Sequence, residues 1–373
     1  MTNPTGATPA KKPCLEHQPS NNTKAVIASD IPLAAAGPVI GTHDGTFHCD
    51  EVLAISMLRL LPAYKESVVV RTRDPTKLAQ CQIVVDVGAE YDASGLRFDH
   101  HQRGFEHTLG DKFKTKLSSA GLVYKHFGRD MLRVMVVSSG AAATFNTEED
   151  VKEEDLMLDK LYIKTYLDFV EHIDGIDNGI NIAEGDLRYT VQTHLPGRVA
   201  TLNPAWNEDD SANALNERFA DALAMVSTEF INFVGYLCKS WWPARQRVAE
   251  GFQGRFTVHP SGKILHLMTY CPWQDHLFDL ELDAGVPGQV LYVLYADSKG
   301  SSVRIHAVPD RVGSFALRLA MPEAWRGLRN EVLGAAVGGI PGCIFVHANG
   351  FIGGNATLEG AMEMAKLALT YVV

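Results

Sequence analysis

Three short runs of apolar residues, rich in valine and isoleucine, constrain the fold of this chain more than any other feature. The runs are Val39–Thr42, Val68–Val70 and Ile83–Val85, and helical patterns separate them, over Asp50–Leu61 and from Pro75. Strands that are apolar along their whole length are typical of a parallel sheet covered on both faces. The sequence therefore predicts an α/β fold with a mostly parallel sheet flanked by helices.

The rest of the chain divides by composition into a leader and two folded parts. Residues 1–37 contain five of the seventeen prolines and no aromatic residue, so they lack the apolar surface that offsets the entropy of ordering. We predict a disordered leader there. Helical patterns then dominate until about residue 252, and strand patterns follow, beginning with Phe256–His259. These changes predict a larger domain over 38–252, which includes a helical segment, and a smaller α/β domain over 253–373.

Composition argues against several environments and functions. The formal net charge of −10 disfavours a polybasic coat for nucleic acid or membranes, and no apolar run is long enough to span a bilayer. Six cysteines without a C-x-x-C pair favour reduced thiols, which indicates an intracellular chain. We expect no membrane partner. Cytoplasm, nucleus and mitochondrion stay open as compartments, and so does a homo-oligomeric state.

Histidine and aspartate recur where the predicted strands and helices end. In chain order these residues are His43, His48 and Asp50, then Asp86, then Asp99, His100 and His101, and finally Asp174 and Asp177. Because the carboxyl ends of parallel strands meet at one edge of a sheet, we expect several of these side chains to converge on a metal site. A lone Asp50 would be interpreted as a helix cap, so the prediction depends on the recurrence.

The types of candidate ligand indicate which ions the site would take. Imidazole and carboxylate ligands without thiolate suit Mn²⁺ best, with Mg²⁺, Co²⁺, Zn²⁺ and Fe²⁺ as alternatives. The set does not resemble a structural zinc site built from cysteines. More than four candidate ligands predict two divalent ions that share a bridging carboxylate.

A second candidate site lies near the C-terminus. Gly353 and Gly354 precede a helical pattern, with His347 and Asn349 just before them. Glycines before a helix let backbone N–H groups approach an anion, so we expect a phosphate-binding element here, with a plain turn as the alternative. Arg304 begins a basic stretch that is either a wall of a cleft for an anionic substrate or a solvated face.

These motifs carry a resemblance to a known superfamily. The order His-x4-His-x-Asp, a strand-ending Asp, Asp-His-His and a later Asp resembles the DHH phosphoesterases. More narrowly, the chain resembles the melanocyte proliferating gene family of metal-dependent hydrolases, through segments that include GTHDGTFHCDE, IVVDVGAEYD, DHHQRGF, LNPAWN and IPGCIFVHANGFIGG. The matching segments run from residue 41 to 354. One departure is Asp44, where the family usually shows Asn.

The resemblance implies a ligand set for two ions. The implied ligands are His43, His48 and Asp174 for one ion, Asp50 and His100 for the other, and Asp86 between them. Asp99 and His101 would be catalytic, orienting a ligand, contacting the scissile phosphate or protonating the leaving group. The C-terminal domain would hold the phosphates of the substrate through residues 347–354.

For function, the resemblance implies a metal-dependent phosphoric ester hydrolase. The expected activity is that of a 3′–5′ exonuclease acting on RNA, with attack by a hydroxide held between two metal ions. One alternative is the hydrolysis of small phosphates, such as pyrophosphate or short oligonucleotides. A second alternative, from a different class, is a non-catalytic regulator whose ions only stabilise the fold.

Overall fold

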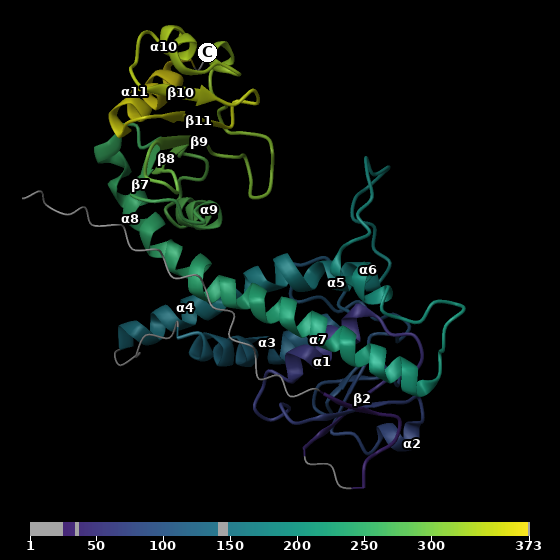
Figure 1. Ribbon diagram of the computed structural model, residues 1–373. Helices are drawn as coiled ribbons and strands as arrows, with labels where there is room; N and C mark the ends of the chain where they lie inside the picture. The colour runs from purple at the N-terminus through teal and green to yellow at the C-terminus, as the bar shows by residue number, and fades with distance from the viewer. Residues whose placement is uncertain (1–24, 34–36, 141–147, 372–373) are drawn as a thin grey trace, which may run out of the picture. The chain divides into compact units, whose positions relative to one another are not determined.

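A computed structural model describes residues 25–33, 37–140 and 148–371 of the chain. These residues form two compact units, which Figure 1 shows in one ribbon. Unit 1 contains the described residues up to Met131 together with Thr165–Phe230, and unit 2 contains those of Leu132–Lys164 and those from Ile231 onward. Each unit has its own sheet flanked by helices, so the predicted α/β fold is confirmed.

The sheet of unit 1 has six strands in the order β1-β3-β2-β4-β6-β5. The strands are β1 (Val26–Ala28), β2 (Val39–Thr42), β3 (Val68–Arg71), β4 (Ile83–Val85), β5 (Tyr91–Asp92) and β6 (Arg97–Phe98). Neighbouring strands are parallel except β5 and β6, which pair antiparallel. The strands β2, β3 and β4 are buried at every residue, as their apolar sequences predict.

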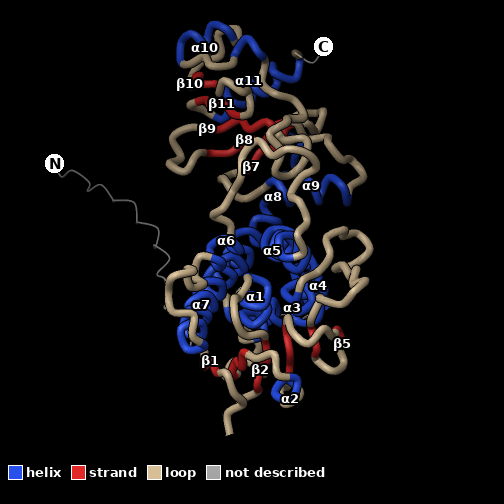
Figure 2. The backbone as a smooth tube through the Cα atoms, turned by 90° about the vertical axis from the view of Figure 1, so that its right-hand side faces the viewer, coloured by secondary structure: helices blue, strands red, loops and turns tan. Residues whose placement is uncertain are grey.

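Helices lie on both sides of this sheet. The helices of unit 1 are α1 (Cys49–Leu58), α2 (Pro75–Leu78), α3 (Ser119–Ser138), α5 (Glu171–Asp177), α6 (Leu195–Ala200) and α7 (Ala212–Tyr236), of which α3 and α7 continue beyond the unit. Figures 1 and 2 show α1 and α3 on one side of the sheet and α2 on the other. Helix α2 begins at Pro75 because Asp74 caps it, accepting a hydrogen bond from the N–H of Thr76 at 2.8 Å.

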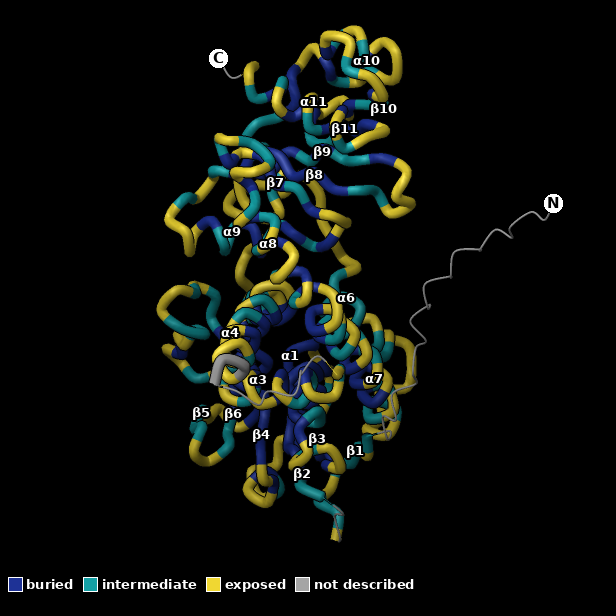
Figure 3. The backbone as a smooth tube through the Cα atoms, turned by 90° about the vertical axis from the view of Figure 1, so that its left-hand side faces the viewer, coloured by how far each residue is buried: buried dark blue, intermediate teal, exposed yellow. Residues whose placement is uncertain are grey.

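Helix α1 is buried along its whole length, as Figure 3 shows. Its first turn includes two carboxylates, Asp50 and Glu51, whose exposed fraction is 0%. The N-terminus of a helix favours negative charge, but two buried carboxylates still cost free energy unless hydrogen bonds or cations compensate them. The start of α1 therefore requires compensating groups from other parts of the chain.

The sheet of unit 2 has five strands in the order β10-β11-β9-β8-β7. The strands are β7 (Ile264–Leu267), β8 (Tyr292–Ala296), β9 (Val303–Ala307), β10 (Cys343–Val346) and β11 (Ile352–Asn355). Neighbours are antiparallel except β7 and β8, which are parallel. Helices α4 (Glu148–Thr165), α8 (Trp242–Val258), α9 (Gln274–Asp283), α10 (Asn330–Ala336) and α11 (Leu358–Thr370) complete the regular structure, with short π-helices at Tyr166–Val170 and Leu237–Trp241 and a 3₁₀ turn at Glu323–Trp325.

Two apolar cores enclose the sheet of unit 2, because successive side chains of a strand point to opposite faces. Leu294 of β8 belongs to the core that includes Met364 of α11. The preceding residue, Val293, belongs to the other core, which includes Val248 of α8 and Leu277 of α9. Unit 2 therefore has the α/β fold that was predicted for the C-terminal part of the chain.

Two predictions of local structure in unit 2 are wrong. The strand expected at Phe256–His259 is instead the end of α8, because the helix continues to Val258. Gly353 and Gly354 lie inside strand β11 rather than directly before a helix, and α11 begins after its N-cap Thr357. A Gly-Gly pair has low strand propensity, so the sequence pattern suggested a loop.

Part of the leader expected over residues 1–37 has regular structure. Strand β1 lies within it and pairs parallel to β3, because Val26 and Ile27 supply the β-branched residues that an edge strand favours. Residues 1–24 and 34–36 of the expected leader lie outside the described residues. The predicted domain boundary at residue 252 lies inside helix α8. The two compact units divide the chain at other positions, and the predicted domains stay a prediction.

No helix among the described residues is both long and apolar enough to cross a membrane.

Candidate metal centre

The loop between β2 and α1 carries the first candidate ligands. His43 directly follows β2, and His48 directly precedes α1. Asp86 directly follows β4, which pairs with β2, so the two parallel strands deliver these residues to the same edge of the sheet. Asp86 has a φ of 57°, a left-handed conformation that aspartate tolerates better than most residues.

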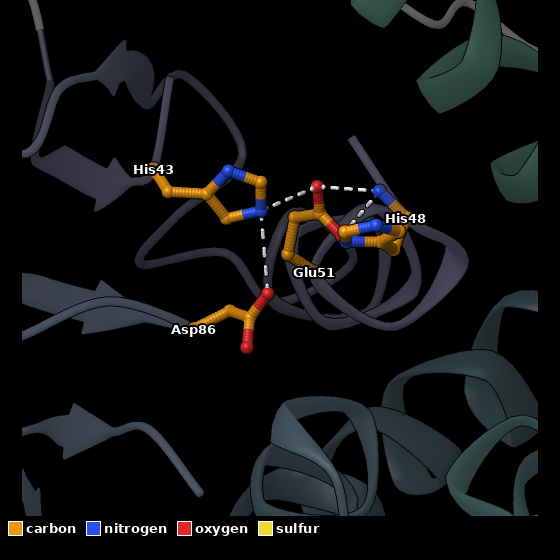
Figure 4. A group of neighbouring side chains, drawn as sticks. All are labelled: His43, His48, Glu51 and Asp86. Carbon is orange, nitrogen blue, oxygen red and sulfur yellow. Dashed lines mark hydrogen bonds and ion pairs between the residues drawn. The ribbon is translucent and has the colours of Figure 1, made fainter. Parts of the chain in front are cut away.

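His43, His48, Glu51 and Asp86 form a first ligand group, drawn in Figure 4. Nε2 of His43 lies 3.1 Å from Oε1 of Glu51 and 3.4 Å from Oδ2 of Asp86. One ligand atom from each of the four residues lies within 4.8 Å of the others. His48 is the exposed member, and the other three are buried. Four donors at this spacing could hold one cation.

Asp50, His100 and Asp177 form a second ligand group, again with ligand atoms within 4.8 Å of one another. Nε2 of His100 lies 2.9 Å from Oδ2 of Asp177. Asp86 connects the two groups, because its Oδ1 lies 3.5 Å from Nδ1 of His100 while its Oδ2 faces His43. Two groups joined by one carboxylate match the arrangement of a two-ion centre.

The carboxylate of Asp50 indicates that the second group fits a cation. Both of its oxygens are buried, and neither has a hydrogen-bond partner among the described residues. Burial, together with the nearby carboxylates of Asp86 and Asp177, raises the pKa of Asp50 well above its ordinary value. An unpartnered buried carboxylate is costly, and a divalent cation would supply the missing interaction.

The surroundings of His43 indicate that the first group also favours a positive charge. Burial opposes the charged form of this imidazole, but hydrogen bonds donated to Asp86 and Glu51 outweigh burial and raise the pKa of His43 to about 10. Without metal, the two carboxylates therefore hold a proton on Nε2. A metal ion must displace that proton before the imidazole can act as a ligand, so binding at this group would release protons.

Asp99 and His101 form a third candidate group with Asp86 and His100, in which the ligand atoms also lie within 4.8 Å of one another. Asp99 is buried and accepts hydrogen bonds from Nδ1 of His101 at 2.6 Å and from the N–H of Ala89 at 2.7 Å. Although burial opposes it, these hydrogen bonds lower the pKa of Asp99, and the bond from His101 raises the pKa of that imidazole. The side chain of His101 is 60% exposed, and its ligand atoms lie within 4.8 Å of those of Asp86 and His100. Asp99 therefore fixes the orientation of His101 next to the ligands.

Asp174, which the family resemblance implied as a ligand, belongs to neither group. It is fully buried, and its Oδ1 accepts hydrogen bonds from the N–H and hydroxyl of Ser118 and from the N–H of Gly121 at 2.8–3.0 Å. The hydroxyl of Tyr166 donates to its other oxygen at 3.2 Å. Asp174 thus accepts hydrogen bonds from N–H groups at the start of α3, which have no partner within the helix. Asp177, one helical turn further along α5, supplies the candidate ligand instead.

This assignment predicts how Asp174→Asn changes stability with pH. Burial raises the pKa of Asp174 to about 7, against roughly 3.9 for an unfolded chain. Between these values the folded chain holds a proton that the unfolded chain releases, so the contribution of Asp174 to stability falls as pH rises from about 4 to about 7. The native chain should lose stability relative to Asp174→Asn over this window, by on the order of a few kcal/mol. Urea unfolding of both proteins between about pH 5 and 8 measures the difference, and a difference that does not vary with pH would contradict the assignment.

Glu51 is the ligand candidate that the sequence analysis missed. Both of its oxygens accept the backbone N–H of His48, at 2.9 and 3.0 Å, as a glutamate at the third position of a helix commonly does. That spacing was a signal for capping, and it gave no reason to expect the contact with His43 as well. Glu51 therefore combines a helix cap with membership of the first ligand group.

Two predicted substrate-binding residues lie opposite each other in the sheet of unit 2. Arg304 in β9 pairs with Gly354 in β11, and a Cβ on Gly354 would lie 2.8 Å from Nη1 of Arg304 and 3.1 Å from the ring of Phe345. Strand β11 has a neighbour on each side, so the backbone N–H groups of Gly353 and Gly354 face other strands rather than an anion. The glycines make room for the side chains above them, which corrects the expected role of an anion-binding loop.

His347 and Asn349 form the turn between β10 and β11. Nδ1 of His347 accepts the N–H of Asn349 at 3.1 Å, and both residues are exposed. The ring of His347 contacts Phe351, with centroids 4.6 Å apart. The turn therefore offers an exposed imidazole and amide to solvent.

Asp44, the departure from the family pattern, belongs to none of the candidate ligand groups. Its side chain is 58% exposed, and its Oδ1 lies 3.3 Å from Nε of Arg73. Its backbone carbonyl accepts a hydrogen bond from Nδ1 of His43 at 2.9 Å. The extra carboxylate is thus a surface ion pair and adds no ligand.

Comparison with known proteins identifies the family. The sequence model of the family MYG1_exonuc, described as "Uncharacterised protein family (UPF0160)", matches residues 39–369. The MYG1 exonuclease of Homo sapiens is 49% identical over 341 residues, which cover 90% of this chain and 86% of the human protein. The chain belongs to the MYG1 family. The family predicted from the sequence motifs is therefore confirmed.

Other MYG1 relatives match over similar lengths. The MYG1 protein of Saccharomyces cerevisiae is 42% identical over 344 residues, covering 88% of this chain and 95% of the yeast protein. A crystal structure of the exonuclease RecJ bound to manganese aligns over 90% of each chain, with 14% identity and a TM-score of 0.22. A TM-score that low supports no conclusion about a shared arrangement.

Proposed function

We propose that this MYG1 protein is a metal-dependent phosphodiesterase that removes nucleotides from the 3′ end of RNA. The observation that carries the proposal is the pair of ligand groups joined by Asp86, with the buried carboxylate of Asp50 lacking a partner. The names of the mammalian relatives, MYG1 exonuclease, support a nucleic-acid substrate.

The residues of the proposed centre suit two divalent ions. The first would be held by His43, His48, Glu51 and Asp86, and the second by Asp50, His100, Asp177 and Asp86. Mixed imidazole and carboxylate donors without thiolate favour Mn²⁺ over a structural zinc ion. Bound there, the ions would supply Lewis-acid stabilisation of charge on the phosphate and lower the pKa of water.

His101 is proposed to donate a proton or hydrogen bond to the reacting phosphate. Asp99 binds its Nδ1, which leaves Nε2 as the free ring nitrogen of a largely exposed side chain. The hydrogen bond to Asp99 also raises the pKa of His101, which keeps the ring protonated over a wider pH range. A protonated imidazole beside the ligand groups is suited to act as a general acid.

Unit 2 is proposed to bind the substrate through cationic and polar groups. Arg304 lies over the ring of Phe345, 5.3 Å from its centroid, and His347 and Asn349 are exposed in the neighbouring turn. Guanidinium groups bind phosphate oxygens, and aromatic rings stack on bases. This part of the proposal depends on side chains and does not require the backbone of Gly353 and Gly354.

His101→Gln is expected to lower turnover on RNA by about 10²–10⁴-fold, the range associated with general acid catalysis. Mn²⁺ affinity should change little, because the ring belongs to neither proposed ligand set. Single-turnover cleavage of end-labelled RNA and calorimetric Mn²⁺ titration measure the two quantities. His107→Gln, another exposed histidine of unit 1, is the control. Loss of Mn²⁺ binding by His101→Gln would instead make His101 a ligand.

A further inference from the structure

The loop over residues 43–48 is held mainly by side chains from other segments of unit 1. Its ends carry His43 and His48, and between them Gly45 has a φ of +83°, which glycine adopts most readily. Side chains from outside the loop bond to the carbonyls of Gly45 and Phe47 and to the N–H groups of Phe47 and His48. Within the loop, His43 bonds to the carbonyl of Asp44. The path of the loop is therefore specified by contacts from outside it as much as by its own sequence.

Asn203 holds Phe47, the next-to-last residue of this loop, by both of its amide atoms. Its Oδ1 accepts the N–H of Phe47 at 3.0 Å, and its Nδ2 donates to the carbonyl of Phe47 at 2.9 Å. Asn203 lies in the segment between α6 and α7, 156 residues further along the chain. An amide that bonds both backbone groups of one residue fixes the position of that residue and of its neighbour His48.

Arg71, the last residue of β3, holds the loop from the sheet. It is buried, and its Nη2 donates to the carbonyl of Gly45 while its Nη1 donates to Oδ1 of Asn216 at 3.3 Å. The guanidinium lies 4.7 Å from the centroid of the Phe219 ring and 5.6 Å from that of Phe47. Arg71 thus joins the loop to β3 and α7 through hydrogen bonds and ring contacts.

We propose that Asn203 and Arg71 are positioning residues that set the affinity of the centre for divalent ions. Neither side chain lies in a ligand group, so both act through the backbone of the loop. Two imidazoles at the ends of a short loop bind one ion well only when the loop holds them at a fixed separation. The inference rests on the proposed metal centre, and it is independent of which phosphodiester is cleaved.

The test is calorimetric titration of Mn²⁺ into the metal-free full chain and its variants. Asn203→Ala removes both contacts to Phe47 and is expected to weaken Mn²⁺ binding by about 10–100-fold. Arg71→Lys keeps the positive charge but loses the planar guanidinium that donates to Gly45 and Asn216 at once. A smaller loss of Mn²⁺ affinity is therefore expected for this variant. Affinities within about twofold of the native value for both variants would overturn the proposal.

A matched asparagine in unit 2 separates positioning from general loss of stability. Asn355 is buried and also bridges backbone groups, donating to the carbonyl of Pro341 at 2.9 Å and accepting the N–H of Thr357 at 3.0 Å. Asn355→Ala should lower the unfolding midpoint without changing Mn²⁺ affinity. An equal loss of Mn²⁺ affinity in Asn355→Ala would overturn the proposal, because the effect would then be a general one.

Hydrogen exchange supplies a readout that needs no metal. In metal-free Asn203→Ala the amide of His48 should exchange at least about tenfold faster, although its own acceptor Glu51 is unchanged, while amides of β3 keep their native rates. Native exchange at His48 would overturn the proposal. If the native chain binds Mn²⁺ but cleaves no RNA, the proposed activity fails, and the comparison of Mn²⁺ affinities still decides the roles of Asn203 and Arg71.

Discussion

Asp86→Asn is expected to lower Mn²⁺-dependent cleavage of RNA by at least about 10³-fold, because it removes the carboxylate that joins the two ligand groups. A neutral amide is a weaker ligand for divalent ions than a carboxylate. The fold should persist, since Asn tolerates the left-handed backbone at this position and its oxygen can still accept the hydroxyl of Ser119, now at 3.1 Å from Oδ1. Alanine would add backbone strain and is the poorer substitution.

The assay is cleavage of labelled RNA and DNA of graded length, with and without Mn²⁺. Asp44→Asn is the matched control, because this exposed aspartate belongs to no ligand group and forms a surface ion pair with Arg73. Retained Mn²⁺-dependent release of nucleotides by Asp86→Asn would rule out the proposed centre. Activity that disappears on oligomers longer than a few nucleotides would favour the hydrolysis of small phosphates over exonuclease action.

Asp177→Asn is expected to have the second largest effect, and Asp174→Asn is its natural control. Asp177 contacts His100 at 2.9 Å in the second ligand group. Burial opposes the charged form of Asp177, but the hydrogen bond and charge of His100, together with the effects of Asp50 and His48, lower its pKa. Replacing it should reduce the number of tightly bound Mn²⁺ ions from two to one and lower turnover by more than about 100-fold. Asp174→Asn keeps the oxygen that accepts the bonds from Ser118 and Gly121, so metal content and turnover should stay near native values.

Metal content by elemental analysis and turnover on RNA decide between the two aspartates. The two variants lie one helical turn apart on α5 and carry the same chemical change, so a loss of metal in only one of them is not a general effect of replacing an aspartate there. If Asp174→Asn lost an ion and Asp177→Asn did not, Asp174 would be the ligand, as the family resemblance implied, and the assignment of Asp177 would be wrong.

Much of unit 1 was predictable because its strands are simple in sequence. The strands β2, β3 and β4 consist mostly of valine and isoleucine and are buried at every residue, and such sequences have few other stable environments. In unit 2, β11 was not predicted because Gly353 and Gly354 have low strand propensity. The structure places the side chains of Arg304 and Phe345 where a side chain on Gly354 would lie. That contact joins residues far apart in the chain, and no local pattern reports it.

The candidate site was predictable where a ligand ends a strand, and less so on helices. His43, Asp86 and His100 follow recognisable strands, and the sheet brings them together. Asp174 and Asp177 lie one turn apart on the same helix, and only the donors around Asp174 show that it faces Ser118 instead of the ligands. Glu51 was not predicted as a ligand because a glutamate at the third position of a helix is expected to cap the helix, and that role alone explains the residue type.

The burial of α1 has a consequence for ion selection. Asp50 and Glu51 belong to the first turn of a helix whose ten residues are all buried, so neither carboxylate can shift far without disturbing the interior of unit 1. Close-packed interiors resist compression and transmit strain. The position of each carboxylate within its own ligand group is then set by apolar packing, and divalent ions differ in the metal–oxygen distance they require. Buried apolar residues such as Val52 and Leu53, which belong to no ligand group, would therefore influence which ion the proposed centre accepts.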